Sequence, residues 1–89
     1  MKADAKTVSR LLKTARGQID GILNMIVEDQ YCVNISNQLM SCVAVLKRAN
    51  TEVLAAHIKS CVREACESGE PGEADKKISE LVELMGKTQ

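Results

Sequence analysis

Hydrophobic residues recur at the helical period in the first third of the chain. From about Lys6 to Glu28 an apolar residue returns at alternating steps of four and three, which is typical of a helix with one buried face. The residues of this face are Val8, Leu12, Ala15, Ile19, Ile22 and Ile26. Gly17 and Gly21 lie inside the same stretch, and each weakens a helix interior by about 1 kcal/mol relative to alanine. We therefore expect another helix to approach closely at these glycines.

A longer apolar seam crosses the middle of the chain. No glycine or proline interrupts the sequence from Asn34 to Ser68, so we predict one helix of roughly thirty or more residues, against a usual mean of about 11–12. The seam consists of Ile35, Leu39, Cys42, Leu46, Ala49, Val53 and Ala56. So long a helix in so small a chain needs a partner along its length. We expect that partner to be a second, antiparallel copy of the chain.

The remaining segments predict a turn, a loop and a third helix. The turn is Glu28–Tyr31, and the loop is the glycine- and proline-containing segment Ser68–Gly72, since these residues interrupt helices. A short helix from about Glu73 to Met85 follows, with Ile78, Leu81, Val82 and Met85 predicted to point inward. The predicted fold is all-α, with three helices, one of them long and central, in a single domain of residues 1–89.

One histidine and two cysteines are the candidates for metal chemistry. His57 and Cys61 are four positions apart, and residues at that spacing share a helix face. Imidazole and thiolate bind soft or borderline metal ions; the alternative is an ordinary half-buried pair. Cys32 could supply a third ligand, but it lies 25 positions before His57. That is about 37 Å along a helix, too far for one ion in one chain.

An antiparallel dimer would remove this distance. If the two-fold axis passes near Val45 and Leu46, Cys32 of one copy lies opposite His57 and Cys61 of the other. That point is the middle of the apolar seam, and a two-fold interface repeats every contact. Each of the two sites would hold two sulfurs and one nitrogen. Such a set suits Cu(I), whereas zinc prefers a fourth ligand.

Composition limits where such a protein would work. A single tyrosine is the only aromatic residue among 89. No apolar run reaches the roughly 18 residues of a membrane span, and the N-terminal segment lacks the apolar core of a signal peptide. We therefore predict a cytoplasmic protein whose four cysteines stay reduced. Reduced cysteines favour metal or redox chemistry over a disulfide framework.

The net charge is zero, but the charges are separated along the chain. Residues 64–83 are mainly acidic, whereas residues 1–16 hold one acid, Asp4, and a group of cations. The cations are Lys2, Lys6, Arg10, Lys13 and Arg16. One basic surface is enough to bind phosphates. The charge pattern leaves two interpretations open, a DNA-binding surface and a solvated helix with an incidental excess of lysine.

Several motifs resemble the CsoR-type family of small helical metal- and redox-sensing repressors. They are Arg16-Gly17-Gln18-Ile19-Asp20-Gly21-Ile22, Glu28-Asp29-Gln30-Tyr31-Cys32, Ile35 with Asn37-Gln38, and His57-Ile58-Lys59-Ser60-Cys61-Val62. The resemblance covers almost the whole chain, and Cys32, His57 and Cys61 match its copper branch, which binds Cu(I) across a dimer interface. It implies a dimer that assembles into a tetramer, binds operator DNA without metal and releases it with Cu(I).

The resemblance also implies roles outside the ligand set. Tyr31 and Glu80 become candidates for groups that hydrogen-bond to the ligands, although Tyr31 could equally pack at the helix junction. Arg48 matches a DNA-contacting arginine, with Lys47 beside it; the alternative there is a surface salt bridge.

The chain departs from the family pattern just before Gly17. Many members read Arg-Leu-Lys-Arg-x-Glu where Leu11-Leu12-Lys13-Thr14-Ala15-Arg16 stands here. Two basic positions are lost, and we expect Arg10 and Arg16 to replace them. The departure leaves the operator sequence open and does not touch the metal ligands.

Three functions follow from these observations. The first is a Cu(I)-responsive repressor, and the second is a thiol-redox or persulfide sensor in which Cys32 and Cys61 cross-link between chains. The third is a copper or zinc buffer that does not bind DNA. Cys42 and Cys66 are not assigned to the site: Cys42 suits the seam as a small apolar residue, and the alternative for Cys66 is a redox or auxiliary copper ligand. An enzyme is not expected, because no nucleophile–base–orienter set is present.

Overall fold

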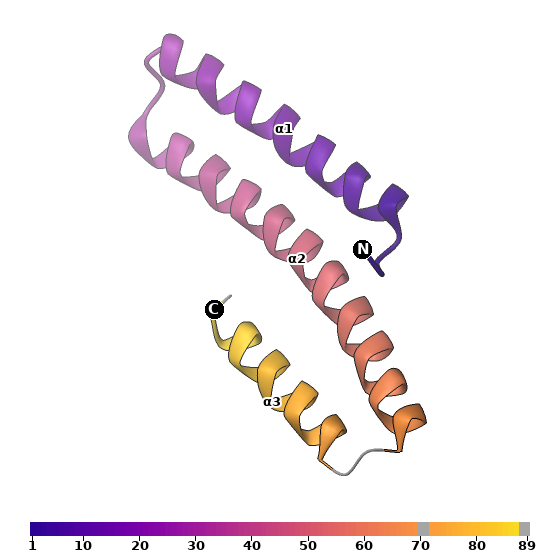
Figure 1. Ribbon diagram of the computed structural model, residues 1–89. Coiled ribbons are helices and arrows are strands. Elements are labelled where there is room, and N and C mark those ends of the chain that lie inside the picture. The colour runs from indigo at the N-terminus through magenta and orange to yellow at the C-terminus, as the bar shows by residue number, and fades with distance from the viewer. Residues whose placement is uncertain (70–71, 88–89) are drawn as a thin grey trace. The chain divides into compact units, whose positions relative to one another are not determined.

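The computed structural model describes residues 1–69 and 72–87 and contains three helices, α1 (Ala5–Val27), α2 (Cys32–Ser68) and α3 (Glu73–Gly86) (Figure 1). No strand occurs in this part of the chain. The predicted all-α fold with a long central helix is therefore confirmed, and α2 is 37 residues long. Both ends of α1 lie within one residue of the prediction. Glu70 and Pro71, the middle of the predicted loop, lie outside the described residues.

The turn after α1 is closed by its own backbone. The Gln30 amide donates to the Met25 carbonyl and the Asp29 amide to the Ile26 carbonyl, each over 3.0 Å. Asp29 has a φ of 54°, so this is a Schellman ending with a non-glycine residue in the left-handed position. The turn caps the last carbonyls of α1 and reverses the chain into α2.

The chain divides into two compact units, Ala5–Asn50 and Met1–Asp4 with Thr51–Gln89. The first unit is a hairpin of α1 and the first half of α2, which run side by side (Figure 1). Its core contains Ala15, Ile22 and Cys42, with Ile35 and Val45 packed against them. The Cys42 thiol donates to the Ala15 carbonyl over 3.8 Å. The prediction that Cys42 is a small buried residue of the seam is confirmed.

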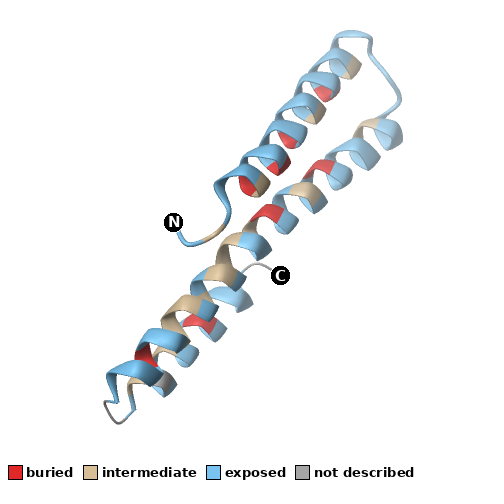
Figure 2. Cartoon of the chain, turned by 90° about the vertical axis from the view of Figure 1, so that its right-hand side faces the viewer, coloured by how far each residue is buried: buried red, intermediate tan, exposed pale blue. Residues whose placement is uncertain are grey.

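Much of each predicted apolar face is nevertheless exposed in the single chain. Figure 2 shows buried residues only as separate patches along the helices, with intermediate and exposed residues between them. The exposed apolar residues of this unit include Leu12, Ile19, Ile26, Leu39 and Leu46. A Cβ atom added at Gly17 or Gly21 would meet nothing within 4 Å. Within the described residues, no helix approaches closely at these glycines.

The second unit joins the N-terminal segment, the second half of α2 and α3. Ala65 of α2 and Leu81 of α3 are buried in it. The prediction that Ile78, Val82 and Met85 point inward is wrong for this chain, because all three are exposed. The reason is geometric: a helix that packs against only one other helix buries a stripe narrower than its apolar face.

The start of α3 is favourable for a helix. Gly72 precedes it with a φ of 82°, a conformation that glycine adopts at no steric cost. Glu73 and Asp75 stand in its first turn, where carboxylates interact favourably with the helix dipole. No helix within the described residues is long and apolar enough to cross a membrane.

Candidate metal centre and basic surface

His57 and Cys61 face each other on one side of α2. The Cys61 sulfur is 3.2 Å from the His57 Nε2 atom and 3.9 Å from Nδ1. The helix itself creates this pair, because residues four apart lie one turn above each other. His57 is exposed and Cys61 is half-buried. The sequence-based prediction that these two side chains share a helix face is confirmed.

The pair is suited to hold part of a metal site. Metal–sulfur and metal–nitrogen bonds are about 2.0–2.3 Å long, so two atoms 3.2 Å apart can both bind one ion. Thiolate and imidazole are the donors that soft and borderline metals prefer. Within the described residues, no group of three His, Cys, Asp or Glu side chains is placed to hold a metal ion. The pair would therefore need a further ligand from elsewhere.

Cys32 stands at the other end of α2. The Tyr31 carbonyl accepts a hydrogen bond of 3.2 Å from the Ile35 amide. Tyr31 therefore caps the N-terminus of the helix, and Cys32 is its first residue. An anionic ligand at this position lies at the positive end of the helix dipole. Cys32 is an exposed free thiol in the hairpin unit, whereas the His57–Cys61 pair belongs to the second unit. The two parts of the predicted site thus belong to different units of the chain.

The other residues predicted near the ligands are exposed. Tyr31 is 70% exposed, and Glu80 is exposed on α3. No hydrogen bond to a ligand residue is described for either side chain, so their roles stay predictions. Cys66 is an exposed free thiol.

Three charged residues beside Cys61 escaped the sequence analysis. Cys61 lines a cavity of about 350 Å³ together with Glu64, Glu73 and Lys77. Glu64 could have been found, because it lies three positions after Cys61 on the same helix face. Glu73 and Lys77 could not, because their position depends on how α3 packs against α2.

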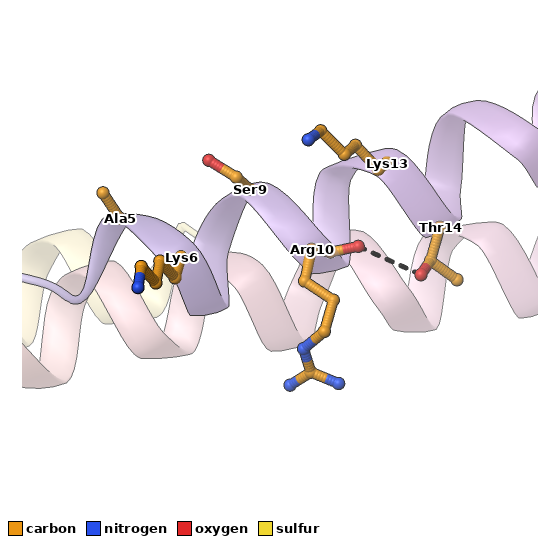
Figure 3. Close-up of a pocket in the computed structure, with 6 residues that line it drawn as sticks. All are labelled: Ala5, Lys6, Ser9, Arg10, Lys13 and Thr14. Atoms are coloured by element: carbon orange, nitrogen blue, oxygen red, sulfur yellow. Dashed lines mark hydrogen bonds between the residues drawn. The ribbon is translucent and has the colours of Figure 1, made fainter.

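All five predicted DNA-binding residues are exposed. Arg10 and Lys13 also line an open groove of about 720 Å³ on the first turns of α1, together with Lys6, Ser9 and Thr14 (Figure 3). The Thr14 hydroxyl donates to the Arg10 carbonyl over 3.0 Å, and the Arg10 guanidinium extends away from α1 (Figure 3). Among the residues that the structure describes, no acidic one lines this groove. Cations and hydroxyl groups at successive turns suit a row of phosphates.

The sequence matches the model of one protein family over nearly its whole length. The family is described as "Metal-sensitive transcriptional repressor", and the match covers residues 4–87.

Three similar proteins are each named as a copper-sensing transcriptional repressor. The chain is 42% identical over 74 residues to the copper-sensing transcriptional repressor CsoR of Mycobacterium ulcerans, which is 83% of this chain and 61% of that protein. It is 36% identical over 80 residues to the protein of the same name in Bacillus subtilis, 90% of this chain and 76% of that protein. A further relative is the copper-sensing transcriptional repressor RicR of Mycobacterium tuberculosis, at 35% identity over 72 residues, 81% of this chain and 74% of that protein.

Proposed function

The chain belongs to the metal-sensitive transcriptional repressor family, and on that premise we propose that it is a copper(I)-responsive repressor. It binds operator DNA when metal-free and releases it when Cu(I) binds Cys32, His57 and Cys61. The observation that carries the proposal is the 3.2 Å approach of the Cys61 sulfur to the His57 imidazole. The family consists of transcriptional repressors, which agrees with the prediction that the chain is not an enzyme.

The choice of copper rests on the donor set and on the relatives. Two sulfurs and one nitrogen suit Cu(I) better than zinc. The relatives in Mycobacterium ulcerans and Bacillus subtilis are named as copper-sensing repressors. The chain spans 61% of the first of these proteins, so the activity of the whole protein is part of the proposal. A cytoplasmic location stays a prediction.

The third ligand is proposed to come from a second copy of the chain. The exposed apolar residues Leu39 and Leu46 lie on the seam where an antiparallel partner helix is predicted. Burial of such a seam is the usual driving force for helix association. The same two-fold arrangement would bring Cys32 of one copy to His57 and Cys61 of the other, in a dimer that pairs further into a tetramer.

DNA binding is assigned to the basic surface, defined here as Arg10, Lys13, Arg16, Lys47 and Arg48. Exposed lysine and arginine side chains gain affinity by displacing the counterions of the DNA backbone. Copper and DNA then bind to different places on the protein, so their effects on each other are a coupling between sites and must be reciprocal.

Two measurements on reduced, anaerobic protein test the proposal. X-ray absorption at the copper edge is expected to show three-coordinate Cu(I) with two sulfurs and one nitrogen, at one copper per chain. Fluorescence anisotropy with a labelled operator duplex is expected to show release as copper is added. A Cys66→Ser variant serves as the control and should behave as wild type. A protein that binds no stoichiometric copper would contradict the proposal.

The accessible thiols support a second candidate, a redox or persulfide sensor. Cys32 is exposed and Cys61 half-buried, and both are free thiols. In such a sensor the two cysteines cross-link between chains. Release of DNA by a polysulfide in the absence of copper, with loss of the effect in Cys32→Ser, would favour this candidate over the first.

A further inference from the structure

The N-terminal segment is grouped with the half of the molecule that holds the His57–Cys61 pair. Met1–Asp4 belongs to the same compact unit as Thr51–Gln89, whereas α1, which starts at Ala5, belongs to the other unit. Ala3 is half-buried, whereas Met1, Lys2 and Asp4 are exposed, so the segment packs through Ala3. The four residues therefore connect the metal-binding unit directly to the basic first turns of α1.

An ion pair links Lys2 of this segment to α2. The Lys2 Nζ atom is 3.9 Å from a Glu64 carboxylate oxygen. Both residues line a groove of about 450 Å³ that also contains Lys59, Arg63 and Glu67. The two side chains are more than half exposed, and such a pair changes an equilibrium constant by about fivefold at most. That is sufficient for a regulatory effect, though not for holding the fold together.

Glu64 lines the Cys61 cavity as well as the groove of Lys2. It shares the first with Cys61 and Lys77 and the second with Lys2. Its position three residues after Cys61 explains this, since both side chains project from neighbouring points of one helix face. Among the described residues, Glu64 is the one that lines both hollows.

We propose that Glu64 and Lys2 transmit metal occupancy at Cys61 to α1. The inference rests on the proposed function. Metal binding releases the protons of the two thiols, so two thiolates and a neutral imidazole around one Cu(I) carry a net negative charge beside Glu64 that the metal-free site lacks. This charge attracts Lys2 and holds the N-terminal segment more firmly on α2 in the loaded protein. The segment then restrains the first turns of α1, whose cations bind DNA, and the loaded state loses affinity for the duplex.

The first test measures the ratio of operator affinities without and with Cu(I). Lys2→Gln and Glu64→Gln are each expected to reduce this ratio by about three- to fivefold, and the double variant should reduce it no further than either single variant. Glu67→Gln removes the same charge from the same groove and should keep the wild-type ratio. Copper stoichiometry is expected to be unchanged in all four proteins. An undiminished ratio in Glu64→Gln, or an equal loss in Glu67→Gln, would overturn the inference.

The second test does not depend on DNA. Amide hydrogen exchange of residues 1–8 is expected to be faster in Lys2→Gln and Glu64→Gln than in wild type or Glu67→Gln, already without metal. In wild type, Cu(I) should slow this exchange further. Equal exchange in all metal-free proteins would overturn the inference. If wild type fails to release DNA with copper while these exchange differences appear, the proposed function fails and the docking of the segment stands.

Discussion

Asp29 ends α1 in a backbone conformation that few side chains adopt. Its φ of 54° is in the left-handed region, where aspartate and asparagine are tolerated better than branched residues. We predict that Asp29→Val lowers the free energy of unfolding by about 1–2 kcal/mol. Asp29→Gly should change the free energy of unfolding by less than about 0.5 kcal/mol, because glycine adopts this conformation without steric cost but loses more conformational entropy on folding. Urea unfolding at a fixed protein concentration measures both.

The matched control for this prediction is Asp20→Val. Asp20 is exposed inside α1, where aspartate and valine have similar helix propensities. Its replacement should leave the unfolding midpoint almost unchanged. An equal loss of stability at positions 20 and 29 would show that the turn conformation is not the cause.

His57 is predicted to serve the coupling between metal and DNA more than the affinity for metal. Two thiolates remain when the imidazole is removed, and thiolates are the preferred ligands of Cu(I). The His57→Ala protein should therefore still bind one Cu(I) per chain tightly but lose most of its release of DNA, because the second imidazole nitrogen can no longer pass the signal to Tyr31 or Glu80. Competition with a Cu(I) chelator and operator anisotropy separate the two effects, with Cys61→Ala as the variant that should lose tight binding. Release at wild-type strength in His57→Ala would contradict this prediction.

At the scale of elements, the helices could be predicted from local signals, and their packing could not. Local sequence encodes the helix breaks at Asp29 and Gly72 and the uninterrupted stretch before Ser68. The boundaries of α1, α2 and α3 could therefore be predicted. Periodicity identifies an apolar face, but not which partner covers it. Leu12 and Leu46 follow the pattern as well as Ala15 and Cys42 do, yet the first two are exposed in the single chain and the last two are buried.

The same distinction holds for the candidate site, where contacts within one helix could be predicted and contacts between helices or chains could not. The His57–Cys61 contact was predictable because one helical turn determines it. The cavity around Cys61 was not, because Glu73 and Lys77 come to it from another helix. Under the proposal, Cys32 completes the metal site of a second chain. The spacing of the three ligands along the sequence is the support for this arrangement.

The basic face of α1 makes a prediction about salt dependence. Each phosphate contact contributes about 0.9 to the slope of log K against log salt concentration. Arg10→Gln and Lys13→Gln are each expected to reduce the magnitude of this slope by about 0.9 in anisotropy titrations with operator DNA. Lys76→Gln, on the exposed side of α3, is the control and should keep the wild-type slope. Equal slopes for Lys13→Gln and wild type would remove Lys13 from the DNA surface.

The exposed seam of α2 makes a prediction about assembly. Leu46 is 43% exposed, so a charged replacement disturbs little within the chain, but it would place two carboxylates close to the proposed two-fold axis. We expect Leu46→Glu to yield a smaller assembly by light scattering while helicity in circular dichroism is retained. Ser41→Glu, at an exposed polar position of the same helix, should assemble as wild type. An unchanged mass for Leu46→Glu would exclude this face as the interface.

At the scale of the whole molecule, a metal site shared between chains can be tested by mixing defective subunits. Cys32→Ser and Cys61→Ser each remove one ligand from both sites of a homodimer, so neither variant alone should bind Cu(I) tightly. In a mixed dimer both defects fall into the same site, because one site takes Cys32 from the first chain and Cys61 from the second. The other site is then complete. Random reassociation of equal amounts should restore about one tight Cu(I) per four chains.

The outcome of this mixing separates the two possible geometries. A site built within one chain would stay broken in every combination, so no copper would be recovered. A mixture of Cys32→Ser with a Cys32→Ser/Cys61→Ser double variant is the control, because no combination of these chains contains a complete site. The recovered copper should also show the two-sulfur, one-nitrogen signature at the copper edge, since the complete site of the mixed dimer has the same ligands as wild type. Recovery in the first mixture and not in the control would mean that copper sensing is a property of the assembled protein, created where two copies of α2 meet.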